Sequence, residues 1–311
     1  MARRTSIVTG GAGFIGSHLA DALLAAGDSV VVIDDLSSGR TDLVPSEAQL
    51  ETVSVTDLDA VDAVVGATRP ARIFHLAAQA SVTASVTDPY RDCEVNVQGT
   101  LNVLEAARRH RSPVVFASTG GALYGNDAPL PTSESQIPAP LSPYGASKWA
   151  AEAYVVTWAH ANDVPHTVCR LGNVYGPRQS PHGEAGVVAI FSYQLWHGET
   201  PTMFGFGRPT RDYIHVADVV RALLAASGVG GVFNVATGQE TSVREVFDVL
   251  QSAAGTNAEP ALAPLRAGEL ERSCLDPGRA GRELGWKQEI EVGEGLRTTY
   301  RELAAEFSTR G

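Results

Sequence analysis

Lysine is almost missing from this sequence of 311 residues, because only Lys148 and Lys287 occur among its 24 basic residues and the rest are arginines. The three cysteines, Cys93, Cys169 and Cys274, lie far apart and form no CxxC pair, which excludes a disulfide framework and a paired-cysteine zinc site. No apolar run approaches the ~20 residues that span a bilayer, and the first residues contain no signal-peptide core. We therefore expect a soluble, cytoplasmic protein with free thiols.

Positive charge is scarce as well, since 24 Lys and Arg stand against 35 Asp and Glu and the formal net charge is −11. Such an acidic chain repels nucleic-acid phosphates and anionic lipid, so we expect neither a nucleic-acid nor a membrane partner. The eight histidines show no HExxH or other paired spacing, and we expect no metal site.

Short β-branched runs alternate with amphipathic stretches through the first half of the chain. Strands are predicted at residues 7–9, 29–33, 50–53, 72–75, 113–118, 167–171 and 231–236, and helices at 14–26, 58–66, 90–110, 144–162 and 243–254. This alternation predicts an α/β fold, a Rossmann-type doubly wound parallel sheet, with a smaller α/β substrate-binding domain after it. We assign residues 1–172, completed by 212–236, to the first domain, and 173–211 and 237–311 to the second.

A glycine-rich turn follows the first strand, where residues 10–16 read GGAGFIG and open a helix. Such glycines let the backbone approach a pyrophosphate, which then lies on the N–H groups at the positive end of the helix dipole. Asp34 and Asp35 end the next strand, where a carboxylate accepts hydrogen bonds from the adenine ribose hydroxyls. Because two carboxylates repel a 2′-phosphate, NAD is favoured over NADP, although Arg40 is an observation against this choice.

A second motif, SPYGASK at residues 142–148, places Tyr144 and Lys148 one helical turn apart. A phenol is a poor base at neutral pH, and a neighbouring ammonium lowers its pKa. Arginine has a broader, flatter head, so a lysine at this position of an arginine-rich chain indicates a selected role. Upstream, the predicted strand 113–118 ends at Ser118 and Thr119, and either hydroxyl is a candidate to contact a reacting sugar oxygen.

Together these residues resemble the extended short-chain dehydrogenase/reductase family and, within it, the UDP-glucose (UDP-galactose) 4-epimerase-like group. The resemblance covers nearly the whole chain. It also includes HLAAQ at residues 75–79, Asn96, RLGNVYGP at 170–177, RDYIHVADV at 211–219, RAGE at 266–269, Asp276 and LGW at 284–286.

The resemblance implies two sets of binding residues. For NAD they are Gly10, Gly13, Phe14, Ile15, Gly16, Asp34, Asp35, Leu36, Ser38, Asp57, Leu58, Leu76, Ala77, Ala78, Gln79, Asn96, Tyr144, Lys148 and Leu171. For a nucleotide sugar they are Asn173, Arg211 and Arg266 at the pyrophosphate, Thr202 and Phe204 near the uracil, Glu269 near the ribose, Val188, and Ser273 beside the sugar 2-substituent. Tyr144, Lys148 and Thr119 or Ser118 would be catalytic.

The sequence departs from the family pattern at three places. The third serine that is common after the central strand is replaced by Gly120, which favours Thr119 as the catalytic hydroxyl. Dehydratase relatives have an Asp-Glu pair where Gly120 and Gly121 stand here, so dehydration lacks its proton-transfer groups. The segment 205–207 reads GFG, where an aspartate is usual in the middle.

The expected activity is therefore NAD-dependent inversion of C4 of UDP-glucose or UDP-galactose through a 4-keto intermediate, as in galactose metabolism. The small Ser273 leaves room for the N-acetyl sugars UDP-GlcNAc and UDP-GalNAc. The alternatives are a nucleotide-sugar 4-reductase or dehydrogenase, an epimerase of another nucleotide sugar such as a UDP-uronate, and a non-catalytic NAD sensor. Relatives commonly dimerise through two helices per subunit, here 90–110 and 144–162, so we expect a homodimer.

Overall fold

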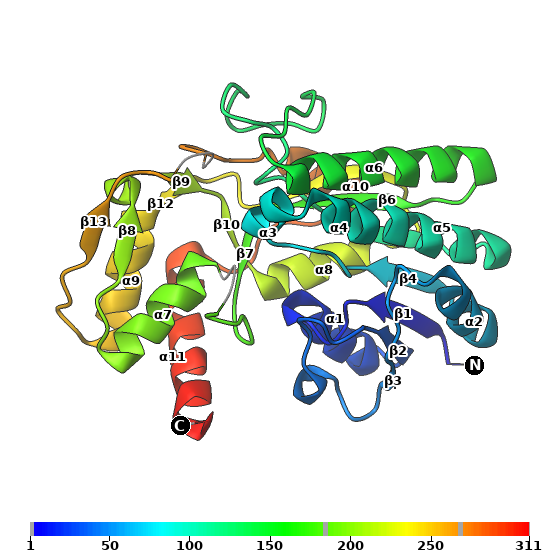
Figure 1. Ribbon diagram of the computed structural model, residues 1–311, viewed down its shortest axis with the longest axis horizontal. Helices are drawn as coiled ribbons and strands as arrows, with labels where there is room; N and C mark the ends of the chain where they lie inside the picture. The colour runs from blue at the N-terminus through cyan, green and yellow to red at the C-terminus, as the bar shows by residue number, and fades with distance from the viewer. Residues whose placement is uncertain (1–2, 183–185, 267–269, 311) are drawn as a thin grey trace.

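The computed structural model describes residues 3–182, 186–266 and 270–310, and its centre is a seven-stranded sheet (Figure 1). The strand order is β11-β6-β5-β4-β1-β2-β3, and all neighbours run parallel. The predicted Rossmann-type fold is confirmed. The strands are β1 (Thr5–Thr9), β2 (Ser29–Ile33), β3 (Gln49–Glu51), β4 (Arg72–His75), β5 (Val114–Thr119), β6 (Thr167–Leu171) and β11 (Gly231–Val235).

Helices cover both faces of this sheet, which explains why its strands are almost continuously apolar. On one face α1 (Phe14–Ala25), α8 (Val216–Ala226) and α10 (Gly278–Leu284) bury a core with Leu19, Leu23, Val219 and Ala280. On the other face α2 (Leu58–Thr68), α5 (Gly99–His110) and α6 (Pro143–Asn162) bury Val61, Val65, Leu104 and Val155. Two cores on opposite sides hold the sheet rigid at its centre.

The single helix predicted over residues 90–110 is wrong in one respect. The structure has α4 (Pro89–Cys93), a π-helical turn (Glu94–Gln98) and then α5. The wide turn carries the buried Asn96, whose amide nitrogen donates to the Gln79 carbonyl at 3.0 Å and to the Ser147 hydroxyl at 3.0 Å. Such π-turns are frequent at functional sites, and this one directs Asn96 toward the loop after β4.

A smaller unit, shown on the left of Figure 1, is built from short pairs of strands and a group of packed helices. The helices pack on one another through Phe191, Leu195, Phe247, Leu250 and Leu296. The strands are β7 (Asn173–Tyr175) with β10 (Tyr213–His215), β9 (Thr210–Arg211) with β12 (Thr241–Ser242), and β8 (Thr202–Phe204) with β13 (Ala261–Ala263). The helices are α7 (Val187–His197), α9 (Val243–Ala254) and α11 (Val292–Arg310). Among the described residues, no helix has the length and apolar character to cross a membrane.

Residues 237–311 were assigned to the second domain, but one segment of them packs against the sheet of the first domain. Ala280 and Trp286 lie in the core beneath the sheet, where α10 contacts α8 and β11. The Trp286 indole nitrogen donates to the Asp218 carbonyl at 3.0 Å. The chain therefore returns to the sheet between α9 and α11, which the composition of this region did not reveal.

Candidate active site

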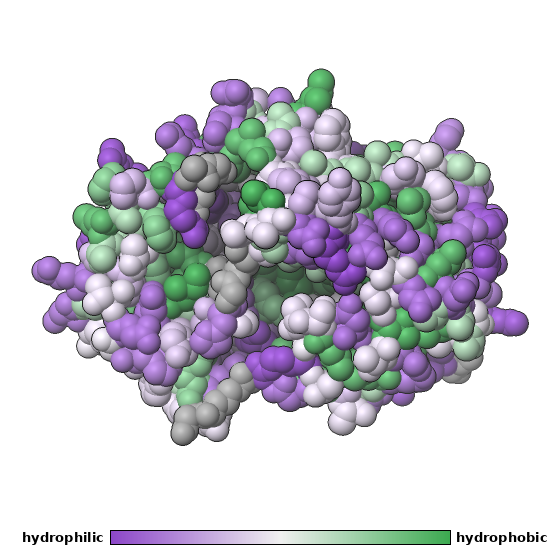
Figure 2. Space-filling view, viewed as in Figure 1, coloured by the Kyte–Doolittle hydropathy of each residue, from purple (hydrophilic) through white to green (hydrophobic). Residues whose placement is uncertain are grey.

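The strand order reverses between β1 and β4, and a cavity of about 760 Å³ opens at the carboxyl ends of these strands. Figure 2 shows the molecule hollowed near the middle of this face, where hydrophobic residues line the opening. The cavity unites many of the predicted residues, namely Gly10, Gly13, Phe14, Ile15, Gly16, Asp34, Asp35, Ser38, Leu76, Ala77, Ala78, Gln79, Ser118, Tyr144, Lys148 and Leu171.

The glycine turn has the geometry that a bound pyrophosphate needs. Gly10 adopts a φ of 70°, and a Cβ there would lie 2.6 Å from the Ala77 nitrogen. A Cβ on Gly16 would collide with the Gly10 carbonyl oxygen. Gly13 is the residue before the first turn of α1, and within the described part of the chain no side chain caps that helix end. The N–H groups of α1 therefore face the cavity at the positive end of the helix dipole.

The two carboxylates after β2 have different surroundings. Asp34 accepts hydrogen bonds from the backbone nitrogens of Ala12 at 3.0 Å and Leu36 at 2.9 Å, and burial raises the pKa of its carboxyl. Asp35 accepts from the Ser37 nitrogen at 3.0 Å. Arg40, the residue that favoured a 2′-phosphate, forms an ion pair with Asp42. Both carboxylates line the cavity, so its ribose end carries negative charge.

Asp57 and Leu58, expected around the adenine, are not among the described residues that line the cavity. Asp57 instead caps α2 by accepting from the Ala60 nitrogen at 3.0 Å. Leu36, Asn96 and Thr119 also lie outside this lining, which includes Ser118. Other lining residues were not predicted. Ile33, Ser37, Gly39, Ala80, Ser81 and Ala117 stand close to predicted residues in the chain, whereas the fold brings in separate segments with Val53, Val55, Arg91, Val95 and His182.

Buried His75 connects the loops around the cavity through one directional chain of hydrogen bonds. The Thr100 hydroxyl donates to the Asn96 carbonyl at 2.6 Å, so it accepts from His75 Nε2 at 3.0 Å. The other nitrogen, Nδ1, then accepts from the Thr9 hydroxyl at 2.7 Å, which itself accepts from the Ala77 nitrogen at 3.2 Å. Burial lowers the pKa of His75 to about 3, in keeping with this neutral tautomer.

Tyr144 and Lys148 lie one turn apart at the beginning of α6, where Ser142 caps the helix. The Lys148 side chain is buried, and its Nζ lies 4.1 Å from the centroid of the Phe116 ring. Burial lowers the pKa of Lys148 to about 7, against the nearby carboxylates of Glu152 and Asp92. The same helix face thus presents a phenol and an amine to the cavity.

The expectation that Lys148 lowers the pKa of Tyr144 is wrong for the protein alone. Burial raises the pKa of Tyr144 to about 12, and the hydrogen bond with the Thr119 hydroxyl opposes this rise without overcoming it. Removal of water favours the neutral phenol, and the negative charge of Asp92 adds to this rise. A phenolate at this position therefore requires additional positive charge beside it.

Ser118 and Thr119 have different partners. The buried Ser118 hydroxyl donates to Glu152 Oε1 at 2.5 Å, whereas Thr119 forms the hydrogen bond with Tyr144. Successive residues of a strand point to opposite sides, which accounts for the division. Of the two hydroxyls that the sequence left open, Thr119 is the one next to the phenol.

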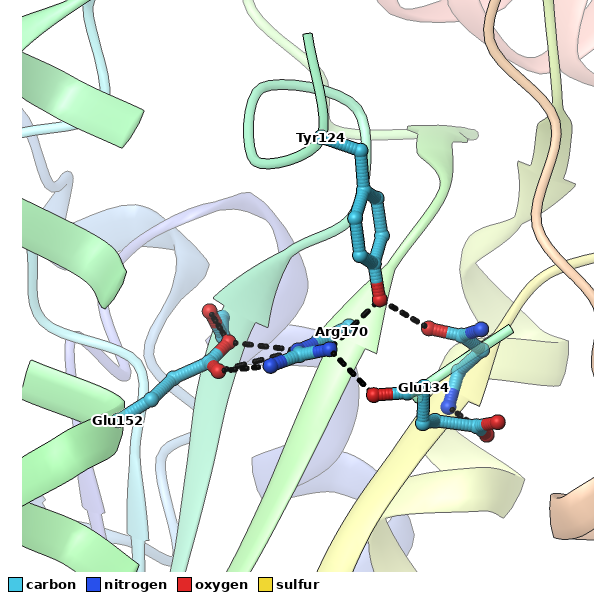
Figure 3. A network of polar contacts seen from close by, with 6 residues as sticks. Tyr124, Glu134, Glu152 and Arg170 are labelled. Carbon is cyan, nitrogen blue, oxygen red and sulfur yellow. Dashed lines mark hydrogen bonds and ion pairs between the residues drawn. The ribbon is translucent and has the colours of Figure 1, made fainter. Parts of the chain in front are cut away.

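Glu152 belongs to a buried polar network behind the cavity (Figure 3). Arg170 Nη2 lies 2.6 Å from Glu152 Oε2, and Arg170 Nη1 donates to the Tyr124 hydroxyl at 2.6 Å. Glu134 extends the network by accepting from the Asn234 backbone nitrogen at 2.8 Å. The network joins α6, β6, β11 and the loop after β5, and thereby holds the helix that carries Tyr144 against the sheet.

The glycines that depart from the family pattern occupy crowded positions. A Cβ on Gly120 would collide with the Leu275 side chain, and a Cβ on Gly121 would lie 3.1 Å from the Asn173 Oδ1. Leu275 is 1% exposed and packs with Leu123 in a small core. A larger residue at position 120 would therefore require Leu275 to move, and one at position 121 would press against Asn173.

The residues expected at the nucleotide sugar lie in the smaller unit and at its boundary with the sheet. The Arg266 guanidinium carbon lies 4.5 Å from the centroid of the Phe204 ring, in β8 with Thr202. Arg211 Nη1 donates to the Thr210 carbonyl at 2.8 Å, and the nitrogen of the buried Ser273 donates to that carbonyl at 3.2 Å. Glu269 lies outside the described residues.

Two other residues predicted to bind the substrate, Asn173 and Val188, have different surroundings. Asn173 begins β7, and its backbone nitrogen donates to the Asp212 carbonyl at 2.7 Å. Val188 is 1% exposed and packs in the core of the smaller unit with Phe191, so its side chain serves folding. The Val188 side chain is therefore not exposed for the contact with a ligand that was expected of it.

Residues 6–236 match the model of a known family, which is described as "NAD dependent epimerase/dehydratase family". The chain is 47% identical over 302 residues to a UDP-glucose 4-epimerase of Mycolicibacterium smegmatis, covering 94% of this chain and 96% of that protein. It is 39% identical over 293 residues to a putative UDP-glucose 4-epimerase of Methanocaldococcus jannaschii, covering 94% and 95%.

Solved structures agree with this similarity. A UDP-glucose 4-epimerase of Thermotoga maritima with UDP-glucose has a TM-score of 0.95 at 42% identity, covering 97% of this chain and 99% of that one. The Thermus thermophilus UDP-glucose 4-epimerase in complex with NAD has a TM-score of 0.90 at 42% identity, covering 96% and 98%.

Proposed function

The chain belongs to the NAD dependent epimerase/dehydratase family, and on that basis we propose that it is a UDP-hexose 4-epimerase. One observation carries the proposal. The Tyr144 phenol lines a dinucleotide-sized cavity, with Lys148 one turn away and the Thr119 hydroxyl as its hydrogen-bond partner. This is the arrangement required to remove a proton from a sugar hydroxyl and return it.

The cofactor is NAD, and the residues present fit it. The N–H groups at the beginning of α1 suit the pyrophosphate, and Asp34 and Asp35 suit a ribose with free hydroxyls. Gly10 and Gly16 allow the turn to pack closely against Ala77 and against its own backbone, which a Cβ at either position would prevent. When bound, NAD⁺ supplies the hydride acceptor for the sugar C4 and, after reduction, the hydride donor.

The protein residues then move the proton and hold the sugar. Tyr144 takes the proton of the 4-hydroxyl and later returns it, while Thr119 hydrogen-bonds the 4-oxygen. Burial keeps the phenol protonated in the protein alone, so a protonated Lys148 would favour the phenolate only together with the positive charge of the oxidised cofactor. A 4-keto sugar that turns over in the site takes the hydrogen back on its other face and emerges inverted at C4.

We propose that the nucleotide end of the substrate binds in the smaller unit. Arg211 and Arg266 have the forked geometry that a diphosphate accepts, with Asn173 beside it. Phe204 and Thr202 would lie near the uracil, Glu269 near the ribose, and Ser273 beside the sugar 2-substituent. The glycines at positions 120 and 121 argue against a dehydratase, because the chain has no carboxylate pair there to transfer the protons.

The central experiment mixes purified protein with UDP-galactose and no added nicotinamide, and follows the configuration at C4. We expect UDP-glucose to accumulate over many turnovers, because an epimerase regenerates its bound NAD; this conversion would give the protein a role in galactose metabolism. A single turnover that stops with reduced cofactor would instead indicate a net reductase or dehydrogenase. Exclusive activity on UDP-glucuronate would indicate a uronate epimerase.

The same assay examines the sugar 2-position. With the small Ser273 there, we expect turnover of UDP-GlcNAc and UDP-GalNAc as well as UDP-glucose and UDP-galactose. Undetectable turnover of both N-acetyl sugars by a preparation that converts UDP-galactose would contradict this assignment.

The two strand-end hydroxyls should respond unequally to alanine. Thr119→Ala removes the hydrogen-bond partner of Tyr144 and should lower kcat about 10²-fold. Ser118→Ala removes a donor to Glu152, which keeps its Arg170 partner, so kcat should stay within about threefold and the free energy of unfolding should fall by about 1 kcal/mol. Equal losses of kcat in both variants would reject the assignment of Thr119.

We also propose that the chain forms a homodimer through α5 and α6. Large apolar side chains on α6 remain exposed in the single chain, including Trp149, Tyr154 and Val156. Exposed patches of this kind are typical of interfaces. Light scattering should then give a mass near twice 32.7 kDa, whereas the mass of one chain would contradict the proposal.

A further inference from the structure

Asp212 is a buried carboxylate between β9 and β10, at the boundary of the two units. It is 1% exposed and accepts hydrogen bonds from several segments. Oδ1 accepts from the Thr237 nitrogen at 2.7 Å and the Thr237 hydroxyl at 2.7 Å. Oδ2 accepts from the Gly238 nitrogen at 2.9 Å and the Leu275 nitrogen at 3.2 Å. One side chain thus ties together the loop after β11 and the segment around Leu275.

Leu275 carries this connection into the active site. Its side chain lies against Gly120, so closely that a Cβ on Gly120 would collide with it. Gly120 directly follows Thr119, and its nitrogen donates to the Leu171 carbonyl at the end of β6, 2.8 Å away. The backbone at Gly120 is therefore held from one side by β6 and from the other by Leu275.

We propose that Asp212 is a positioning residue of the reaction, because it fixes Leu275 and Leu275 in turn holds Gly120 and the neighbouring Thr119 hydroxyl toward Tyr144. The inference rests on the proposed epimerase function. It also explains the glycine at position 120, because Leu275 occupies the space that a serine side chain would need there. Asp212 itself is not among the described residues that line the cavity, so it acts through its neighbours.

Asp218 provides a matched control from the same stretch of sequence. It is fully buried, accepts from the backbone nitrogens of Glu289 at 3.1 Å and Ile290 at 3.1 Å, and also pairs with the Arg221 guanidinium. These partners lie near the beginning of α11 and not at the active site. Replacement of either aspartate by asparagine removes acceptor capacity from a buried hydrogen-bond cluster, so both variants should lose stability.

The first experiment compares kcat and KM in Asp212→Asn and Asp218→Asn, using full-length protein with its retained NAD and UDP-galactose as substrate. We expect Asp212→Asn to lose about 10- to 100-fold in kcat with little change in KM, since a displaced catalytic group has effects of this size. Asp218→Asn should keep kcat within about twofold at a temperature where both variants are folded. Equal kcat in the two variants would overturn the inference.

A second pair of substitutions covers the case in which Asp212→Asn does not fold. Gly120→Ala should lower kcat because its methyl group meets Leu275, and Leu275→Ala should lower kcat because Thr119 loses its support. In the double variant, Leu275→Ala removes the side-chain atoms that the added methyl group of Gly120→Ala would meet. The kcat of the double variant should therefore exceed that of Gly120→Ala alone. Additive losses would show that Leu275 does not act through Gly120.

The wild-type protein separates failure of this inference from failure of the proposed function. If wild-type protein does not invert UDP-galactose, the proposed function fails. If it does so and Asp212→Asn and Leu275→Ala both retain kcat, only the positioning role of Asp212 is wrong.

Discussion

Tyr144→Phe should lose about 10²- to 10⁴-fold in epimerase kcat, the range typical of removing a general acid–base group. The substitution deletes only the phenolic oxygen that is expected to exchange a proton with the sugar 4-hydroxyl. It leaves a ring of the same shape on α6, so folding and retention of NAD should be preserved. The rate is measured with UDP-galactose, and the bound cofactor by its absorbance after release.

A Tyr144→Phe protein with the full epimerase rate would reject the proposed mechanism. Tyr154→Phe is a suitable control, because that tyrosine is on the same helix but is 38% exposed and packs edge-on against Trp158, with 5.9 Å between the ring centroids. It should keep kcat within about twofold, because Tyr154 is not among the described residues that line the cavity and the substitution leaves its ring available for the proposed dimer interface.

Lys148→Arg should lower kcat about 10²-fold even though it preserves the positive charge. Lys148 is 3% exposed and its Nζ lies 4.1 Å from the centroid of the Phe116 ring, so a broader guanidinium has no equivalent place. Overpacking of such a site typically costs about 1–3 kcal/mol in the free energy of unfolding. The measurements are kcat and the free energy of unfolding from chemical denaturation.

Lys287→Arg is the control for this prediction, because Lys287 is the only other lysine of the chain. Its side chain is exposed, and its backbone carbonyl, which accepts from Arg221 at 3.0 Å, is unchanged by the substitution. We expect kcat and stability equal to wild type. If Lys148→Arg were equally silent, a compact ammonium beside Tyr144 would not be required.

The regular elements around the sheet were largely predictable from the sequence. The strands 29–33, 72–75 and 167–171 and the helix 243–254 coincide with the structure, because apolar runs and 3.6-residue periodicity reflect local burial. The predicted helix 90–110 is interrupted by a π-helical turn, which depends on the contacts of Asn96 with Gln79 and Ser147. No local pattern reports contacts of this kind.

The site was predictable in part for the same reason. The glycine turn at 10–16 and the Tyr144–Lys148 pair are each contained in one short segment, so their spacing is visible in the chain. The hydrophobic wall from Val53 and Val55 was missed, because these residues come from a separate segment. The pKa of Tyr144 was predicted in the wrong direction, because burial depends on everything packed around α6.

Sequence alone was sufficient for the fold class, the cofactor and the pair of residues expected to carry the chemistry, since each depends on residues that are neighbours along the chain. Tertiary structure was needed to favour Thr119 over Ser118, to show that the Leu275 side chain lies against Gly120, and to propose that Asp212 acts on the active site. Each of these results depends on segments that are distant in the sequence, Asp212 and Leu275 being 63 positions apart, and such contacts arise only when the chain packs.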